Sequence, residues 1–323
     1  MKRENRKCKF AIVFIVALIV VFGLLPLSGC APKTGTSGPG KISVSFVSSP
    51  LNVPSILEKQ KRLFEGEFRP AAVEWLNLTT GPQQTQALAS GDLNFAHAIG
   101  ATSVLLAASQ GVGLKIVGVY SRGPKSFMIL AKNNAVASIA DLRGKKIGGP
   151  KGTVLDQLLA AALKTQGLTE QDVDFISMDI PLAAAALENG SIDAALLAGP
   201  AALKAEDAGA RLITDGQGLT NGTIFTVVTR DFYAQHRETV DRFTKVHREA
   251  VDYMLKNEPE VLAMAAKETG LTQAQTDTLY RWYDFDPAIR PEDIAELRLT
   301  QDFLLESGLQ RSRVDIDTLF DKY

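Results

Sequence analysis

Residues 78–100, LTTGPQQTQALASGDLNFAHAIG, decide the fold, because they join two candidate binding loops through one short helix. Residues 79–81 form a turn, Pro82 suits the first helical position, and Gly91 ends the helix. The start of this helix leaves unpaired backbone N–H groups beside two threonine hydroxyls. This arrangement suits an anion or a polar ligand head.

The second candidate loop follows one strand later. Residues 93–95 read as a short buried strand, residues 97–100 as a loop, and residues 101–110 as a helix of small residues. Two strand-to-helix loops this close in the chain predict one rim of a cleft.

Strands and helices alternate on both sides of this stretch. Residues 41–121 read as strand, helix, strand, helix, strand, helix, strand, and the pattern restarts after a break at residues 121–124. ALASGDLNFA at 87–96 and ALENGSIDAA at 186–195 share a helix, a glycine stop and an apolar strand. Such alternation predicts α/β lobes with parallel strands and right-handed crossovers, here two lobes of similar structure. From residue 231 onward the pattern is mostly helical.

The N-terminus is typical of an exported lipoprotein. A basic cluster at residues 2–9 precedes an apolar run at 10–25, which is short for a membrane span but suits a signal-peptide core. Leu27-Ser28-Gly29-Cys30 follows and resembles a bacterial lipobox, which predicts a signal peptide at 1–29 and lipidation of Cys30. The alternative is an uncleaved anchor helix. Residues 30–41 are rich in Gly, Pro, Ser and Thr and predict a flexible tether.

Charge and cysteine content exclude several classes of protein. Residues 1–29 carry five positive charges and one negative charge, so cleavage changes the formal net charge from −1 to −5. A mildly acidic body disfavours nucleic-acid binding. The two cysteines of the chain are Cys8 and Cys30, so the mature body has no disulfide and no cysteine-bound metal.

Three ordered blocks carry a family resemblance. They are TTGPQQTQALASGDLNFA, ADLRGKKIGGPKGT at 140–153 and ALENGSIDAALLAGPA at 186–201. Together they resemble the extracytoplasmic solute-binding proteins of ABC importers, in the nitrate, sulfonate and taurine branch that shares ancestry with the thiamine-precursor binders.

The resemblance implies an architecture. It is an α/β periplasmic-binding-protein fold (type II) with two lobes, each a mostly parallel sheet flanked by helices, joined by two crossing hinge strands. Lobe 1 would comprise residues 42–122 and 226–323, and lobe 2 residues 123–225. The implied protein is a monomer outside the cytoplasmic membrane, with an ABC permease and ATPase as partners and no cofactor.

One departure concerns the ligand. Where alkanesulfonate binders carry an aromatic and acidic loop, this chain has Leu197-Ala198-Gly199-Pro200. The aromatic wall and the carboxylate are both missing there, so sulfonate specificity is not carried over. The ligand class stays open between a small organic anion and a thiamine-precursor-type pyrimidine or other aromatic heterocycle.

The candidate ligand-binding residues lie in loops at the carboxyl ends of predicted strands, where helix N-termini face a cleft. They are Ser48, Ser49, Asn52, Thr79, Thr80, Gly81, His97, Ile99, Gly100, Arg122, Lys151, Gly152, Thr153 and Gly199. Each has a plainer interpretation: the hydroxyls can be helix caps, Lys151 a solvated lysine, Arg122 a salt-bridge or hinge residue, and His97 a packed core histidine.

Catalysis finds little support. The sequence has no G-x-S-x-G elbow and no phosphate-binding glycine loop, and His236 and His247 lack metal-ligand spacing. We therefore predict no catalytic residue and no metal site. A ligand-sensing lipoprotein or an exported enzyme are the alternatives. The thiamine-pyrimidine synthases that share the implied fold use a cysteine-rich motif, which this chain lacks.

Overall fold

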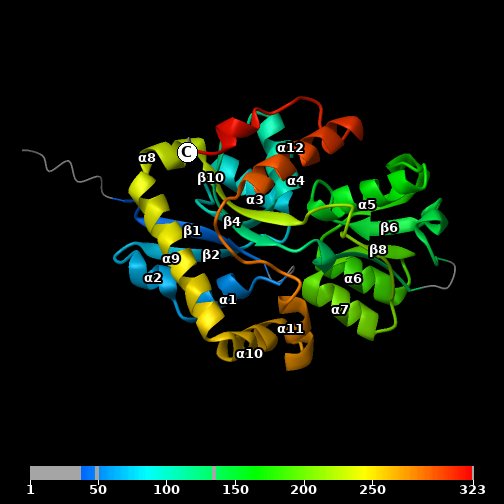
Figure 1. The fold of residues 1–323 in the computed structure, drawn as a ribbon, viewed down its shortest axis with the longest axis horizontal. Helices are drawn as coiled ribbons and strands as arrows, with labels where there is room; N and C mark the ends of the chain where they lie inside the picture. Colours follow the sequence, from blue (N-terminus) through cyan, green and yellow to red (C-terminus); the bar gives the residue numbers. More distant parts are fainter. Residues whose placement is uncertain (1–37, 48–50, 133–135, 322–323) are drawn as a thin grey trace, which may run out of the picture. The chain divides into compact units, whose positions relative to one another are not determined.

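The computed structural model describes residues 38–47, 51–132 and 136–321, and strands alternate with helices through most of this part (Figure 1). The strands are β1 (Lys41–Phe46), β2 (Ala72–Asn77), β3 (Ala96–Gly100), β4 (Leu114–Arg122), β5 (Phe127–Ala131), β6 (Lys146–Gly149), β7 (Asp174–Ser177), β8 (Ala194–Ala198), β9 (Arg211–Asp215) and β10 (Thr223–Thr229). The helices are α1 (Val53–Gln60), α2 (Leu63–Glu67), α3 (Gly81–Ser90), α4 (Ala101–Ser109), α5 (Val154–Thr165), α6 (Ile180–Asn189), α7 (Gly199–Asp207), α8 (Arg230–Gln235), α9 (Arg237–Lys256), α10 (Glu258–Thr269), α11 (Gln273–Tyr280) and α12 (Pro291–Glu306). The predicted signal peptide and Cys30 lie outside the described residues.

One sheet has five strands in the order β7-β6-β8-β5-β9. β6 is parallel to β7 and β8, whereas β5 is antiparallel to both of its neighbours, β8 and β9. The strands lie between α5 on one face and α6 and α7 on the other (Figure 1). The parallel strands are connected through helices, as the sequence pattern predicts.

The remaining strands form two smaller sheets. β1 and β2 pair in parallel, and β10 lies between β3 and β4, antiparallel to both. A parallel bridge between Val44 and Phe95 connects the two sheets, and the Ser45 N–H donates to the Phe95 carbonyl at 3.0 Å. β1, β2, β3 and β4 therefore share one direction, and β10 runs against them.

The chain passes twice between the five-stranded sheet and the smaller sheets. It leaves β4 and enters β5 through a short 3-10 helix, Pro124–Ser126, and it returns from β9 to β10 through residues 216–222. The strand that follows each passage, β5 or β10, is the antiparallel member of its sheet. At these two passages the chain departs from the pattern in which each strand is connected to a parallel neighbour through a helix.

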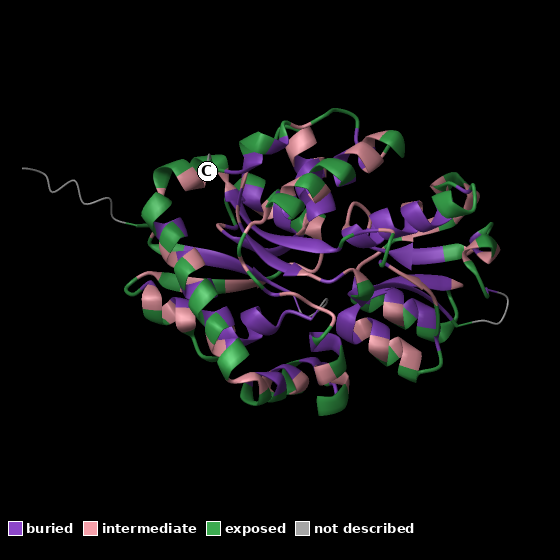
Figure 2. Ribbon diagram, viewed as in Figure 1, coloured by how far each residue is buried: buried purple, intermediate pink, exposed green. Residues whose placement is uncertain are grey.

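Burial follows the sequence pattern. All residues of β5 and of β8 are buried, which accounts for their continuous apolar runs, because a strand covered on both faces has no solvent side (Figure 2). α9 instead buries one stripe that includes Val240, Phe243 and Met254. Within the described residues, no helix combines the length and apolar character that crossing a membrane requires.

Two local predictions are wrong. Residues 96–100 form β3, where the sequence predicts a strand at 93–95 and a loop at 97–100, because pairing with the distant β10 gives this short run its hydrogen bonds. β9 is not predicted at all. Its sequence, RLITD, is polar at both ends, and it pairs with β5 alone at the edge of its sheet.

Candidate ligand-binding site

A small cavity lies where the starts of several helices meet. Its volume is about 60 Å³. The residues that line it are Val47, Thr79, Thr80, Gly81, Gln84, Ala98, Gly100, Ser103, Phe127, Pro150, Thr153, Val154, Leu155, Ile180 and Ile224. None of them is charged. We call this space the inner cavity.

Three helices begin at the wall of the inner cavity. Thr80 is the N-cap of α3, Gly100 of α4 and Thr153 of α5. A helix N-terminus carries roughly half a positive charge and exposes unpaired N–H groups. The convergence of these helix starts makes the cavity favourable for an anion without any lysine or arginine.

Side-chain capping leaves some of these groups free to bind a ligand. The Thr80 hydroxyl accepts from the Gln83 N–H at 3.4 Å, and the Gln83 side chain accepts from the Thr80 N–H at 3.1 Å. In this capping box the Thr80 hydroxyl oxygen acts as a hydrogen-bond acceptor. The O–H of Thr80 therefore remains available to donate a hydrogen bond to a ligand. No side chain caps the start of α4 at Gly100 or of α5 at Thr153, and the Thr153 hydroxyl donates instead to the Pro150 carbonyl at 2.8 Å.

Two glycines allow the helix starts to come this close. A Cβ at Gly81 would lie 2.0 Å from the Ser103 Oγ, and a Cβ at Gly100 would lie 2.8 Å from Val154 Cγ2. A side chain at either position would push apart the elements that form the cavity wall.

The backbone is strained at the same place. Ala98 has a φ of 91° and lies opposite an irregularity in the pairing of β3 with β10, between Phe225 and Thr226. A non-glycine residue in this region is uncommon, and bulges recur beside functional sites. The Gln84 side-chain NH₂ donates to the Ala98 carbonyl at 3.3 Å, so the bulge is held in place at the cavity wall.

Hydrogen bonds join α4 to the elements of the five-stranded sheet beside the cavity. The Ser103 hydroxyl donates to the Gly152 carbonyl at 2.7 Å. The Thr102 hydroxyl donates to the Gln157 side chain of α5 at 2.6 Å, and both side chains are buried. These two hydrogen bonds hold α4 against α5 and the loop before it on this side of the cavity.

A larger cavity adjoins the inner one and shares Thr80, Ser103 and Pro150 with it. Its volume is about 740 Å³. Apolar Leu106 and Leu182 line it together with polar side chains from α3 and α4. We call this space the outer cavity.

The structure brings several of the predicted site residues together. Thr79, Thr80, Gly81, Gly100 and Thr153 line the inner cavity. Lys151 and Gly152 line the outer cavity. Asn52, Ile99 and Gly199 are buried beside these walls without lining either space. Ser48 and Ser49 lie outside the described residues.

Lys151 is already engaged by acidic groups. Its ammonium contacts Glu170 and lies 3.2 Å from Asp156 Oδ1. Burial acts to lower the pKa of Lys151, but the two carboxylates outweigh it and raise the pKa. Asp156 also accepts from the Gly152 N–H at 2.8 Å, so the ion pair shapes the loop that enters α5.

Arg122 forms an ion network away from both cavities. Its guanidinium makes a bidentate pair with Asp293 at 2.6 Å for each bond and reaches Asp284 at 3.3 Å. Arg122 therefore occupies the position of a salt-bridge residue near a passage between sheets, which is the plainer of the two interpretations of the sequence.

His97 lies in the core. Its side chain is fully buried, with Nε2 2.9 Å from Glu58 Oε2 and Nδ1 2.9 Å from the Thr226 hydroxyl. The residue that follows it, Ala98, reaches the inner cavity in its place.

Sequence reasoning missed Gln84, Ser103 and Phe127, which line the inner cavity, whereas Ala98 lies in the predicted loop at 97–100 without having been singled out. Gln84 and Ser103 each lie within the first turn of a helix whose start was predicted as a binding loop, so the helical spacing offered a signal for them. Nothing in the local sequence marks Ala98 as bulged, because its partner strand is distant in the chain.

The arrangement of strands and helices has known counterparts. The alkanesulfonate-binding protein SsuA from Xanthomonas axonopodis pv. citri, solved with bound MOPS, matches 89% of this chain and 100% of its own length, with a TM-score of 0.80 and 24% identity. The fold is that of the periplasmic binding proteins, so the predicted α/β fold class is confirmed.

The family follows from the sequence match. Residues 72–261 match the model of the family described as NMT1/THI5 like, and the chain belongs to this family. An inferred aliphatic sulfonates-binding protein of Bacillus subtilis is 28% identical over 95% of this chain and 94% of its own length. The taurine-binding periplasmic protein of Escherichia coli is 28% identical over 65% of this chain and 68% of its own length. The resemblance drawn from the three sequence blocks is thereby confirmed.

Proposed function

We propose that this chain is a solute-binding lipoprotein that captures a small organic anion outside the cytoplasmic membrane and delivers it to an ABC permease and ATPase. Membership of the NMT1/THI5-like family and the binding-protein relatives support the solute-binding role. The lipobox at residues 27–30 supports the lipid anchor at Cys30. No catalytic role is proposed.

The main observation in favour of an anionic ligand is the convergence of three helix N-termini on the inner cavity. The N-caps Thr80, Gly100 and Thr153 surround a space that no charged side chain lines. Backbone N–H groups and hydroxyls can satisfy an anionic head without a full counter-charge. A cationic ligand would meet the positive ends of the same helices and would be disfavoured.

The two cavities fit a ligand with a head and a tail. A volume of about 60 Å³ holds a few water-sized groups, since one water needs roughly 10–15 Å³ on this measure. That space fits a compact head such as sulfonate, and the outer cavity takes the rest of the molecule. The outer cavity is lined mainly by uncharged side chains together with Lys151 and Asp179, and the Asp179 carboxylate already accepts the Leu182 N–H at 3.0 Å. We therefore propose an uncharged tail in preference to one that ends in an ammonium group.

Capture is proposed to involve bending at the two passages between sheets, residues 123–126 and 216–222. The hydrogen bonds from Ser103 to Gly152 and from Thr102 to Gln157 would form on closing and trap the ligand. Binding energy would then shift an open–closed equilibrium toward the closed form.

A matched pair of variants tests the site. Thr80 caps α3 and Thr272 caps α11, each in a capping box with a glutamine at the third helical position. Thr80→Val and Thr272→Val each remove a cap, which costs about 1 kcal/mol of stability. Only Thr80→Val also removes a hydroxyl donor to the bound anion, worth roughly 1.5–3 kcal/mol, and it should weaken binding by about 10–100-fold.

The measurement is titration calorimetry on the mature body after a thermal-shift screen of short alkanesulfonates, nitrate, carboxylates and pyrimidines. We expect alkanesulfonates with uncharged tails to give the largest rise in melting temperature. Equal loss of affinity in the two variants, or a preference for a cationic or neutral compound, would contradict the proposed site.

A further inference from the structure

Three buried side chains from separate elements meet beneath α9. They are Glu58 of α1, His97 of β3 and His247 of α9. The two carboxylate oxygens of Glu58 lie 2.9 Å from His97 Nε2 and 2.7 Å from His247 Nδ1. The two imidazole rings are nearly perpendicular, with centroids 4.6 Å apart. None of these groups lines the inner or the outer cavity.

The cluster holds a fully buried carboxyl group, Glu58, whose two oxygens face ring nitrogens of His97 and His247. Among the described residues, no lysine or arginine forms an ion pair with Glu58. A buried carboxylate without a fixed cationic partner is costly, and a bound cation would offset that cost.

The donor atoms and their spacing suit a transition metal. Two imidazole nitrogens and one carboxylate oxygen are zinc ligands, and all three groups offer an atom within 4.8 Å of the others. Bonds of about 2.0–2.2 Å to a tetrahedral Zn²⁺ would place neighbouring donors about 3.4 Å apart. The observed contacts of 2.9 and 2.7 Å would therefore widen by about 0.5–0.7 Å.

The surroundings of the rings fit metal binding as well. The Thr226 hydroxyl lies 2.9 Å from His97 Nδ1, so its oxygen can accept a hydrogen bond from Nδ1–H when Nε2 binds a metal. Such an outer contact fixes the tautomer and the orientation of a ligating histidine. His247 Nε2 has no hydrogen-bond partner among the described residues, so the proton can move to that nitrogen and free Nδ1.

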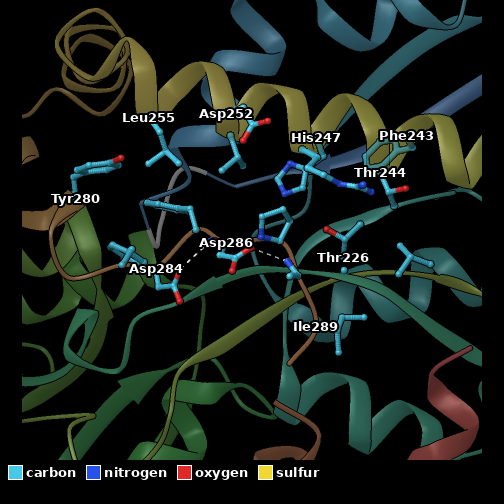
Figure 3. Close-up of a pocket in the computed structure, with 18 of the residues that line it drawn as sticks. Thr226, Phe243, Thr244, His247, Asp252, Leu255, Tyr280, Asp284, Asp286 and Ile289 are labelled. Carbon is cyan, nitrogen blue, oxygen red and sulfur yellow. Dashed lines mark hydrogen bonds between the residues drawn. The ribbon is translucent and has the colours of Figure 1, made fainter. Parts of the chain in front are cut away.

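A cavity provides a route to the cluster. A space of about 920 Å³ lies between α9 and residues 280–289, and His247 and Thr226 both line it. Figure 3 shows His247 projecting from α9 toward this space, with Asp284 and Asp286 on the opposite wall. Arg248 and Arg281 also line the cavity, so its rim has mixed charge and selectivity for a cation must come from the cluster itself.

We propose that Glu58, His97 and His247 form a binding site for Zn²⁺. The metal has three protein ligands, and water from the cavity beneath α9 completes a tetrahedral shell. The site ties α1, β3 and α9 together. It is separate from the proposed anion site, so either one can fail without the other.

Zinc titration of the untagged mature body tests the proposal. The chain contains only three histidines, and His236 is the one outside the cluster, which makes it a matched control. We expect one Zn²⁺ per chain, by calorimetry and by metal analysis after dialysis, in the wild-type protein and in His236→Gln. His247→Gln should lower the affinity at least 100-fold. Equal affinity in the two variants, or no binding at micromolar Zn²⁺, would overturn the site.

A wild-type measurement avoids any dependence on how the variants fold. Imidazole nitrogen spectra of ¹⁵N-histidine protein should show three rings, of which two move on addition of one equivalent of Zn²⁺. Assignment through His236→Gln identifies the ring that stays. Movement of the His236 signal alone would show adventitious surface binding and would contradict the proposal.

Discussion

His97 illustrates what a single residue's neighbours in sequence can and cannot reveal. The sequence places it directly after an apolar stretch and aims it at a cleft, whereas the structure pairs it with Glu58 and Thr226. Those partners are 39 and 129 residues away. Helix caps such as Thr80 depend on local spacing and are predictable, but the partners of a buried histidine depend on tertiary packing. The same reason hides the link between Arg122 and Asp293.

Asp156 gives a pH-dependent prediction at the residue scale. Burial, together with Glu170, raises its pKa from 3.8 to about 6. Because the folded protein binds this proton more tightly than the unfolded chain, the contribution to stability is full below about pH 4 and is lost as the pH rises to about 6. The free energy of unfolding should therefore fall across this window by an amount on the order of 1–3 kcal/mol.

The check is urea unfolding of Asp156→Asn and of the wild type at several pH values. The variant should show a shallower fall between about pH 4 and 6. Glu296 has a pKa of about 6 for a related reason, burial, so Glu296→Gln is the companion variant that separates the two contributions. An unchanged slope in Asp156→Asn would mean that this carboxyl does not titrate in the window.

At the scale of elements, local pattern predicts the helices and the long strands well. Capping residues and glycine stops bound α3 and α6 in the sequence as in the structure. β3 and β9 escape prediction because each is short and is defined by its pairing partner, β10 for β3 and β5 for β9. A strand of five residues without strong β-branched character acquires its identity from the sheet it joins.

The connection between β4 and α12 yields a stability prediction. Arg122 at the end of β4 pairs with Asp293 in the first turn of α12, whose side chain is 2% exposed. Arg122→Met should cost about 3–5 kcal/mol, because it leaves the buried carboxylate without its charge partner. The double variant with Asp293→Asn should recover part of this loss, since the amide has no charge to leave unpaired and keeps an oxygen for the Arg290 N–H.

Urea unfolding of both single variants and the double variant measures the coupling as a double-mutant cycle. A surface pair, Lys41 with Glu74, serves as the control, and its coupling should be below about 1 kcal/mol. Additive losses for Arg122 and Asp293 would show that the two residues stabilise the fold independently.

At the scale of the whole molecule, the order of motifs was more informative than any one of them. Three blocks in sequence predicted the fold class and the family, and they also identified the helix starts that line the inner cavity. The sequence blocks did not predict that β5 and β10 run antiparallel to the other strands of their sheets. It results from the two passages between sheets, which local alternation does not encode.

The proposed closure around a ligand would involve the molecule as a whole. Thr102 of α4 and Gln157 of α5 are in contact at 2.6 Å, and bending at the two passages would separate them. Placing like charges there with Thr102→Asp and Gln157→Glu should disfavour the closed form, because juxtaposed like charges cost several kcal/mol when desolvated. Replacing Gln157 by Lys in the Thr102→Asp background should restore closure, since the charges are then opposite.

Small-angle scattering and ligand titration of these two double variants distinguish the outcomes. The like-charged variant should show a larger radius of gyration, and it should bind the best alkanesulfonate at least 10-fold more weakly than the opposite-charged variant, because closing must first overcome the repulsion. Both variants carry the same Thr102→Asp change and the same number of introduced charges, so their difference reports the contact itself. Equal radii and equal affinities would mean that α4 and α5 stay together throughout binding, and the bending motion would then have to lie elsewhere in the chain.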